Sequence, residues 1–270
     1  MATTREMKFP TKKMIARKDG HVGWMIFNNP SRRNALSLEM WAAIGEIMAE
    51  FQADKEIRVV VMAGAGEKAF VSGADISEFE KHRSTANDEE EYNRISSSSQ
   101  QALKDFDKPL IAMIQGFCIG GGLAVALTAD IRIASEDSQF GIPAARLGLG
   151  YGFDGLKVLS DLVGPSSAKD ILFSARRLDA AEAIRIGLVN QVVPREGLEK
   201  VVRTYVEKLS ENAPLTIQAA KAAVNEGLKD PASRDLKNLE NNIRAIFDSD
   251  DYKEGRRAFM EKREPVFRGH

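Results

Sequence analysis

Glycines stand in front of expected helices at three places, in a pattern that suits binding of a polarised carbonyl oxygen. The three segments are Phe70–Asp75, Gln115–Gly122 and Phe140–Gly148. Glycines before a helix leave the first-turn N–H groups uncovered and let a ligand approach the main chain closely. The helix macrodipole adds partial positive charge at the same place. Two such termini facing each other would form an oxyanion hole for a thioester carbonyl as it becomes an enolate.

Other chemistries that these residues suggest have weaker support. The run Pro109–Gly122 places glycines after a strand, as nucleotide-binding loops do, but it lacks the spacing G-x-G-x-x-G. The sequence also lacks G-x-x-x-x-G-K-[ST] and G-x-S-x-G. Histidine occurs only at positions 21, 82 and 270, and no Cys/His cluster indicates a metal site. A nucleotide-phosphate loop, a serine-hydrolase triad and a metal centre are therefore disfavoured.

Buried strands, each followed by a glycine-bearing loop and a helix, must position these loops. Strands are expected at Met14–Ala16 and Val22–Phe27, and Ser37 opens a helix with apolar residues at helical spacing as far as Phe51. The order strand, glycine loop, helix then recurs from Val59 to Phe79 and from Pro109 to Ala129. Repeats of this kind favour a spiral or layered α/β core over an alternating doubly wound sheet.

The rest of the chain differs in character from this core. Residues 84 to 100 are polar and predict a solvated segment that ends in a helix. Beyond residue 196 the pattern is almost wholly helical, with breaks near Pro214 and Pro231. We therefore expect a core at 1–196 that holds the site and a helical oligomerisation region at 197–270.

Composition limits the partners and the compartment. A net charge of -1 over 270 residues gives no basic footprint for nucleic acid. No run approaches the roughly 20 apolar residues of a membrane-spanning helix, and the polar N-terminus does not resemble a signal peptide. The single cysteine, Cys118, excludes an intrachain disulfide and fits a reducing compartment. We expect a cytoplasmic protein that binds neither nucleic acid nor membrane.

Several motifs, in order and over about residues 13 to 268, resemble the enoyl-CoA hydratase/isomerase (crotonase) superfamily. They are Asn34–Ser37, Ser72–Asp75, Gly120–Gly122 with Ala129–Ala134, Phe140–Pro143, Asp179–Ala183 with Gly187–Asn190, and the tail Glu254–Arg263. The resemblance implies a crotonase-type spiral of ββα units with a C-terminal helical trimerisation region. It also implies a homotrimer or a dimer of trimers. Coenzyme A would enter as part of an acyl-CoA substrate, with no other cofactor.

The resemblance also implies roles for individual residues. The N–H groups of Ala74 and Gly121 would form the oxyanion hole, and Arg32 or Arg33 would lie near the CoA phosphates. Phe259 and Lys262 would approach the adenine, often from a neighbouring subunit. The other residues implied at the CoA site are Ala35, Ser72 and Ile76.

The sequence departs from the family where hydratases carry two glutamates. Those positions are Ala124 and Ala144 here, and a methyl group cannot transfer a proton. The aspartate that some isomerases and dehalogenases carry eight residues after the second glutamate is replaced by Gly152. Asp154 becomes the best remaining acid or base, although it is equally suited to cap a helix over Leu156–Leu162.

Other polar residues are weaker candidates. Tyr151 would donate a hydrogen bond to an enolate, while Glu78, His82 and Arg146 would either face the pocket or lie on the surface. Cys118 is expected to be a small packed residue. A lone acid or base suits a CoA-thioester lyase or isomerase better than hydration. The alternatives are a catalytically inactive acyl-CoA-binding protein and a hydrolase of a β-diketone-like substrate.

Overall fold

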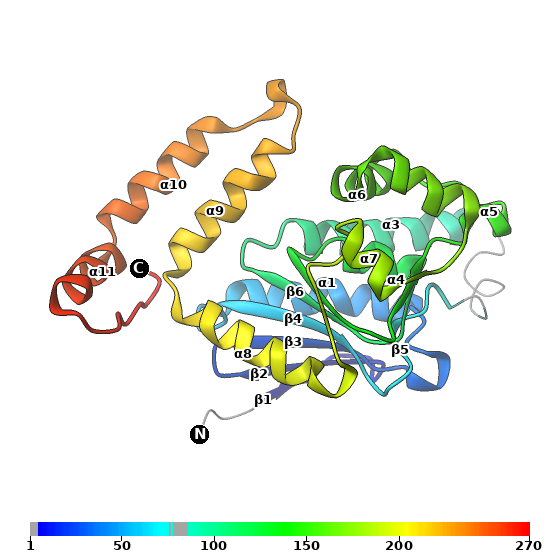
Figure 1. Ribbon diagram of the computed structural model, residues 1–270, viewed down its shortest axis with the longest axis horizontal. Helices are drawn as coiled ribbons and strands as arrows, with labels where there is room; N and C mark the ends of the chain where they lie inside the picture. Colours follow the sequence, from blue (N-terminus) through cyan, green and yellow to red (C-terminus); the bar gives the residue numbers. More distant parts are fainter. Residues whose placement is uncertain (1–4, 76, 78–85) are drawn as a thin grey trace.

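The computed structural model describes residues 5–75, 77 and 86–270, and these form two β-sheets flanked by helices (Figure 1). The larger sheet has seven strands in the order β1-β2-β3-β4-β6-β8-β11, and the smaller has four in the order β10-β9-β7-β5. The larger sheet contains Arg5–Met7 (β1), Met14–Asp19 (β2), Val22–Phe27 (β3), Val59–Gly64 (β4), Leu110–Ile114 (β6), Ile131–Ser135 (β8) and Gln191–Val193 (β11). The smaller contains Ala69–Val71 (β5), Phe117–Ile119 (β7), Gln139–Gly141 (β9) and Leu178–Asp179 (β10).

From β4 to β9, consecutive strands alternate between the two sheets, which confirms the expected repeat. Strands β4, β6 and β8 join the larger sheet, and β5, β7 and β9, which follow them in turn, join the smaller. Neighbours from β3 to β11 are parallel, as are β5, β7 and β9, whereas β1, β2 and β10 pair antiparallel. A helix follows each strand pair, so the chain winds as a spiral of ββα units.

Two helices begin at the local signals in the sequence, Ser37 and Pro214, whereas α4 and α6 begin two and three residues before the expected Leu123 and Leu156. Ser37 caps the first helix by accepting a hydrogen bond from the Met40 N–H, as expected. Pro214 occupies the first turn of a later helix, where its missing N–H costs nothing. The α-helices are Leu38–Ala53 (α1), Ala86–Lys104 (α3), Gly121–Ala126 (α4), Ala144–Leu147 (α5), Phe153–Ser174 (α6), Ala180–Arg185 (α7), Leu198–Glu211 (α8), Pro214–Gly227 (α9), Leu236–Asp248 (α10) and Asp250–Glu261 (α11). Short 3₁₀ turns lie at Pro30–Arg32 (η1), Arg195–Gly197 (η3) and Pro231–Ser233 (η4).

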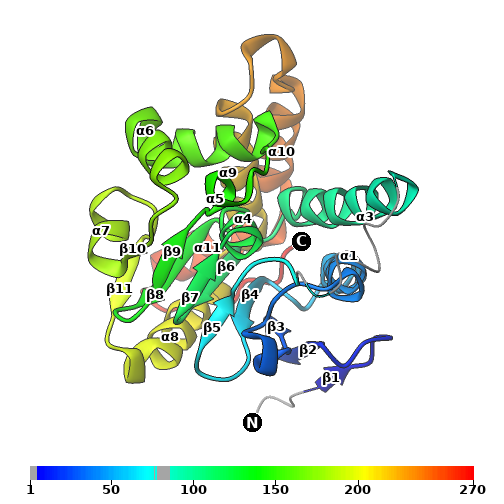
Figure 2. The same ribbon diagram turned by 90° about the vertical axis from the view of Figure 1, so that its right-hand side faces the viewer.

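Both faces of the larger sheet are covered, which explains the uninterrupted apolar run in β4. Val60 and Met62 pack in a cluster with α1 and the smaller sheet, whereas Val59 and Val61 pack in a second cluster with α8. A strand buried on both faces needs apolar residues at every position rather than at alternate ones. Figures 1 and 2 show α8 on one side of this sheet, and the smaller sheet and α1 on the other.

Part of the polar segment expected at 84–100 is a regular helix, α3, that packs along α1. The Nε1–H of Trp41 donates to the Tyr92 hydroxyl (3.1 Å), and the Ser99 hydroxyl donates to the Trp41 carbonyl (2.5 Å). One face of α3 is therefore fixed to the core, and the polar residues that dominate its sequence lie mainly on the other. The expected helix over Ile76–Phe79 lies outside the fully described residues.

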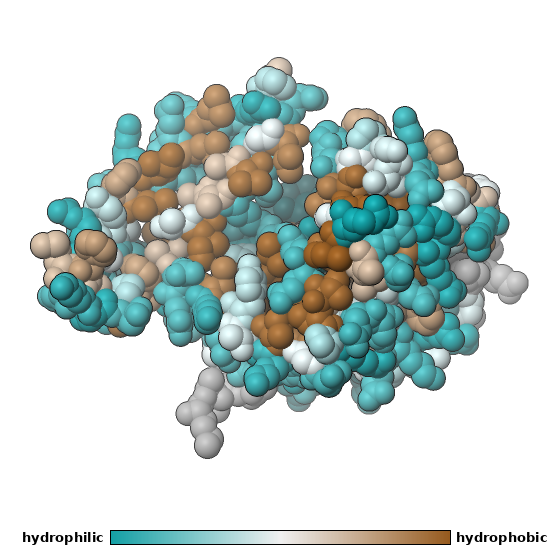
Figure 3. All heavy atoms as spheres, in the orientation of Figure 1, coloured by the Kyte–Doolittle hydropathy of each residue, from teal (hydrophilic) through white to brown (hydrophobic). Residues whose placement is uncertain are grey.

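The helices α9, α10 and α11 extend from the body as an arm (Figure 1). Neither α9 nor α10 contains a buried residue, and apolar side chains gather along the arm in Figure 3. Lys221 ties α9 to the body through an ion pair with Asp130 (2.8 Å) and a hydrogen bond to the Lys108 carbonyl (2.9 Å). In the described part of the chain, no helix combines the length and apolarity needed to cross a bilayer.

Candidate active site

The Ala74 N–H is oriented by a short parallel bridge to Leu36. The Leu36 N–H donates to the Gly73 carbonyl (2.8 Å), and the Asp75 N–H donates to the Leu36 carbonyl (2.9 Å). In such a bridge the residue between the two bonded groups directs its own N–H to the opposite side. The Ala74 N–H therefore points away from Leu36.

Gly121 lies beside this amide and begins α4. A methyl group built on its Cα would lie 3.7 Å from the Ala74 nitrogen, so the two main-chain segments are in close approach. Gly120 before it adopts a φ of +55°, which favours glycine, and donates its own N–H to the Gly141 carbonyl (2.8 Å). Within the described residues, neither the Ala74 nor the Gly121 N–H donates a hydrogen bond. Two neighbouring N–H groups without a partner are the kind of donor from which an oxyanion hole is built.

A buried asparagine holds the loop next to these amides. The Asn34 side chain donates to the Ala65 and Ala69 carbonyls (both 2.9 Å) and accepts from the Asn29 N–H (2.9 Å). Both Asn34 and Arg33 have positive φ, 57° and 53°, a conformation that asparagine tolerates better than most residues. The loop is therefore fixed by its own polar contacts rather than by glycine.

The predicted CoA-contacting residues Arg32, Arg33, Ala35 and Ser72 come together around this loop. The Ser72 N–H donates to the Arg33 carbonyl (3.1 Å), and its hydroxyl donates to the Arg32 carbonyl (3.3 Å). Ala35 is buried, whereas both arginine side chains are exposed. This arrangement leaves two cations in solvent within a few residues of the paired amides. Ile76 lies outside the described residues.

The Tyr151 hydroxyl also lies at the glycine turn. A methyl group built on Gly120 would be 4.0 Å from this oxygen and 4.0 Å from the Gly73 Cα. Burial raises the pKa of Tyr151 above its usual value, because the phenolate loses solvation. Among the described residues the hydroxyl has no hydrogen-bond partner, and the side chain is 36% exposed. The phenol is therefore protonated at neutral pH and lies at the turn of Gly120, one residue before Gly121.

Asp154 is not the helix cap that the sequence allowed. Helix α6 begins at Phe153, three residues before the expected start, and its N-cap is Gly152. Asp154 lies in the first turn with its side chain exposed, where an acidic residue interacts favourably with the helix dipole. The predicted role as a helix cap was wrong, because α6 begins before the first residue of its apolar pattern. Asp154 therefore remains available as an acid or base.

The remaining candidates do not converge on the amides. Arg146 lies exposed on α5, and Phe259 (84% exposed) lies on α11. Lys262 ends α11 in a left-handed conformation. Figure 1 shows α11 at the opposite end of the molecule from α4 and α5, so these two residues cannot reach the site of their own chain. Glu78 and His82 lie outside the described residues.

Sequence reasoning missed two contributors near this site. Leu36 orients the Ala74 amide through main-chain hydrogen bonds alone, and no side-chain chemistry marks that role. The other is Arg177, whose guanidinium carbon lies 5.1 Å from the centre of the Phe117 ring, as does that of Arg33. Nothing in the local sequence indicates a contact between residues so far apart. In the described part of the chain, no cluster of His, Cys, Asp and Glu side chains has a metal-binding arrangement.

Comparisons with known proteins identify the family of the chain. The family model described as enoyl-CoA hydratase/isomerase matches residues 17–270. A short-chain-enoyl-CoA hydratase from Clostridium acetobutylicum is 36% identical over 250 residues, which cover 93% of this chain and 95% of that protein. An (E)-benzylidenesuccinyl-CoA hydratase from Thauera aromatica is 35% identical over 249 residues, covering 92% and 96%.

A solved structure gives the same result for the fold. The enoyl-CoA hydratase from Bacillus anthracis superposes with a TM-score of 0.89 at 30% identity, covering 96% of this chain and all of that one (100%). Family members act on CoA substrates and need no additional cofactor. The chain therefore belongs to the enoyl-CoA hydratase/isomerase (crotonase) family, whose members act on CoA thioesters.

Proposed function

We propose that this chain binds an acyl-CoA, stabilises its thioester enolate between the Ala74 and Gly121 N–H groups, and carries out isomerase- or lyase-type chemistry. The observation that carries the proposal is that these two N–H groups are neighbours and neither donates a hydrogen bond within the described residues; a methyl group built on Gly121 would lie 3.7 Å from the Ala74 nitrogen. Charge that develops on the thioester oxygen meets donors already in place, so little reorganisation is needed during the reaction.

Proton transfer is assigned to Tyr151 and Asp154. The relatives compared above are named hydratases, but the side chains at 124 and 144 here are methyl groups, which neither bind nor activate water. The Tyr151 hydroxyl lies at the turn of Gly120, and Asp154, three residues later, lies in the first turn of α6. A single proton carrier suffices to move a double bond or to protonate a carbanion after C–C cleavage. Hydration in addition requires an activated water.

We also propose that the protein assembles as a homotrimer or a dimer of trimers through its helical arm. The support is the exposed apolar surface of α9, α10 and α11, which an isolated chain would leave in water. Large exposed side chains there are Val224 (66%), Leu228 (58%), Ile243 (53%), Phe247 (56%) and Phe259 (84%). In such an assembly Phe259 and Lys262 would reach the CoA site of a neighbouring subunit.

The test measures enolate formation directly, without a known substrate. Butyryl-CoA is incubated with the protein in D₂O, and mass spectrometry follows deuterium incorporation at the carbon next to the carbonyl. A parallel screen covers crotonyl-, 3-enoyl-, malonyl-type and aromatic CoA thioesters, whose products would identify the reaction. Exchange by the unaltered protein is the expected result, because enolisation is the step that the paired amides assist.

Two variants separate the acid/base assignment from the fold. Tyr151→Phe and Asp154→Asn should each lower exchange by roughly 10²–10⁴-fold if the group transfers the proton. Asp161→Asn, on the same helix as Asp154, is the matched control and should exchange at the unaltered rate. Full activity in both test variants would place the acid/base elsewhere. Tight thioester binding without exchange or turnover by the unaltered protein would instead indicate an inactive acyl-CoA-binding protein.

A further inference from the structure

Helix α6 consists of two helical halves that meet at Gly164. This residue has a φ of 78° and a ψ of 158°, and Pro165 follows it. That backbone conformation is essentially restricted to glycine, and it breaks the helix. The first half, residues 153–163, begins two residues after Tyr151, whose hydroxyl lies at the turn of Gly120. The direction in which this half leaves Gly164 therefore affects where the Tyr151 hydroxyl lies.

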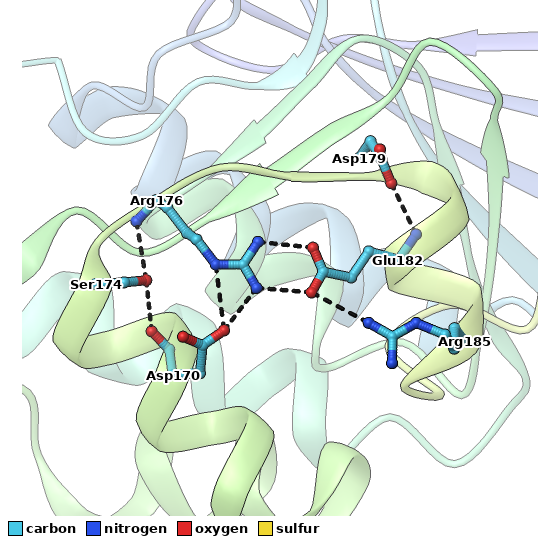
Figure 4. Close-up of polar contacts among 6 residues, drawn as sticks. All are labelled: Asp170, Ser174, Arg176, Asp179, Glu182 and Arg185. Carbon is cyan, nitrogen blue, oxygen red and sulfur yellow. Dashed lines mark hydrogen bonds and ion pairs between the residues drawn. The ribbon is translucent and has the colours of Figure 1, made fainter.

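The second half of α6, residues 165–174, is joined to α7 by Arg176 (Figure 4). The Arg176 guanidinium donates to both Glu182 oxygens in the first turn of α7 (2.7 and 2.6 Å) and to Asp170 in α6 (2.6 Å). The planar fork of a guanidinium holds two carboxylates in a fixed geometry, which a flexible ammonium group does not. The Arg176 N–H also donates to the Ser174 hydroxyl (3.3 Å). One arginine thus fixes the end of α6 to the start of α7.

At this junction the charged contacts replace tight packing between the two helices. A hollow lies beside Arg176, lined by Ser166, Ser167 and Ile171 of α6 and by Arg185 of α7, among others. In Figure 4 the Arg176 guanidinium lies between the carboxylates that the two helices contribute. Without it, the two carboxylates would repel each other across the hollow. We therefore expect the relative position of α6 and α7 to depend on this side chain.

The main chain of Arg176 contacts the strand that carries the glycine turn. A methyl group built on Gly141 in β9 would lie 2.8 Å from the Arg176 carbonyl oxygen, so the two segments are in close contact. The Gly141 carbonyl in turn accepts the Gly120 N–H (2.8 Å), one residue before the Gly121 amide. Arg176 therefore contacts α6 through its side chain and the support of the amide site through its backbone.

These contacts form a closed circuit that includes the proposed proton carrier. Its members, in order, are Gly120, Gly141, Arg176, Asp170, Gly164 and Tyr151. In the first half of α6 only Leu159 and Val163 are buried, so its direction depends strongly on the half to which it is joined. Loss of the Arg176 guanidinium would open the circuit at the junction between α6 and α7.

We propose that Arg176 is a positioning residue for Tyr151: it fixes the second half of α6, and through the break at Gly164 it holds the phenol at the glycine turn. This rests on the proposed function, in which Tyr151 transfers a proton. A misplacement of about 1 Å caused far from the chemistry can cost roughly 10²-fold in rate. The Ala74 and Gly121 donors do not lie on α6, so loss of Arg176 should slow proton transfer and leave thioester binding unchanged.

The experiment measures deuterium exchange of butyryl-CoA by the unaltered protein, Arg176→Gln and Arg176→Lys. Arg176→Gln should lower kcat roughly 10- to 100-fold with KM unchanged. Arg176→Lys keeps the charge without the fork and should fall in between. Arg185→Gln is the matched control, because Arg185 contacts the same Glu182 (3.4 Å) from within α7 and should exchange at the unaltered rate.

Two further readouts separate positioning from a general effect on the fold. If Arg176 acts through Tyr151, Arg176→Gln should cause no further loss in a Tyr151→Phe background. Burial raises the pKa of Tyr151, so release of the phenol into solvent should move the alkaline limb of the pH–rate profile to lower pH in Arg176→Gln. A general structural role would lower the rate equally in both backgrounds and leave the pH profile in place.

Each outcome decides the proposal. If Arg176→Gln exchanges at the unaltered rate, or loses as much activity in the Tyr151→Phe background, the positioning role is refuted while the acyl-CoA function stands. If Tyr151→Phe itself exchanges at the unaltered rate, the acid/base assignment fails, and the role of Arg176 fails with it. Absence of exchange by the unaltered protein would overturn the proposed enolate chemistry and this inference together.

Discussion

Replacement of Gly121 by alanine should affect the proposed oxyanion hole and the stability of the fold in opposite directions. The new methyl group would lie 3.7 Å from the Ala74 nitrogen, 3.8 Å from the Gly73 carbonyl carbon and 3.9 Å from the Leu36 Cδ1, all ordinary van der Waals contacts. Gly121 does not have a positive φ, so alanine is compatible with its conformation. Replacing a glycine at a compatible position stabilises a protein by about 0.4–1 kcal/mol.

The effect on function should be opposite in sign. The methyl group would lie 3.7 Å from the Ala74 nitrogen, so we expect it to hinder the approach of a thioester oxygen to that donor. Loss of one such donor costs about 2.7–4 kcal/mol in the barrier, or 10²–10³-fold in rate. We therefore expect Gly121→Ala to melt at the same temperature or a few degrees higher, and to exchange the α-hydrogens of butyryl-CoA about 10²–10³-fold more slowly.

Gly122→Ala provides the matched comparison one residue further along. There the methyl group would overlap the Val71 carbonyl oxygen and lie 2.8 Å from its carbonyl carbon, so the helix or β5 must shift. Overpacking of this kind destabilises by about 1–3 kcal/mol. Calorimetry and the exchange assay on both variants test the reasoning. Exchange at the unaltered rate by a folded Gly121→Ala protein would show that the oxygen does not bind between these amides.

Three further predictions follow from contacts described above. Burial raises the pKa of the Cys118 thiol well above its usual value. An aromatic disulfide reagent should therefore modify Cys118 only after unfolding. Rapid modification of the native protein would contradict this burial. Burial also raises the pKa of Tyr151, so its phenol stays protonated through neutral pH. If exchange depends on that proton, the exchange rate should fall only above pH of about 10. Loss of exchange at lower pH would exclude Tyr151 as the donor. Asn34→Ala removes two buried hydrogen bonds and one part-buried hydrogen bond from a left-handed position. It should lower the free energy of unfolding by roughly 3 kcal/mol in a urea titration, whereas a cost below about 1 kcal/mol would show that the loop relaxes.

Much of the core followed from sequence because local and global signals agree there. The apolar run of β4, the Ser37 cap and the glycine turn before α4 each require one local conformation, and the repeated unit fixes their order. The start of α6 was misjudged because Phe153 is 76% exposed and adds no apolar periodicity to a buried face. Its helical conformation is set by the main chain rather than by burial.

The site was harder to predict because its parts meet only in three dimensions. Glycines before helices indicated a place for unpaired amides, but the bridge from Leu36 that turns the Ala74 N–H outward has no signature in side chains. The contact of Arg177 with Phe117 depends on the pairing of β9 with β7 and β10. Such register is a property of the assembled sheet and cannot be read from either segment alone.

The two donors of this site belong to the peptide backbone, which has a consequence for how the protein can change. Under the proposed function, substitutions at 124, 144, 151 or 154 would change which group moves a proton and would leave the two backbone donors for the thioester in place. Single substitutions could thus change the reaction that this framework catalyses, while each variant along the way still binds the substrate. Glutamates installed at positions 124 and 144 would test whether the same backbone donors can support the addition of water.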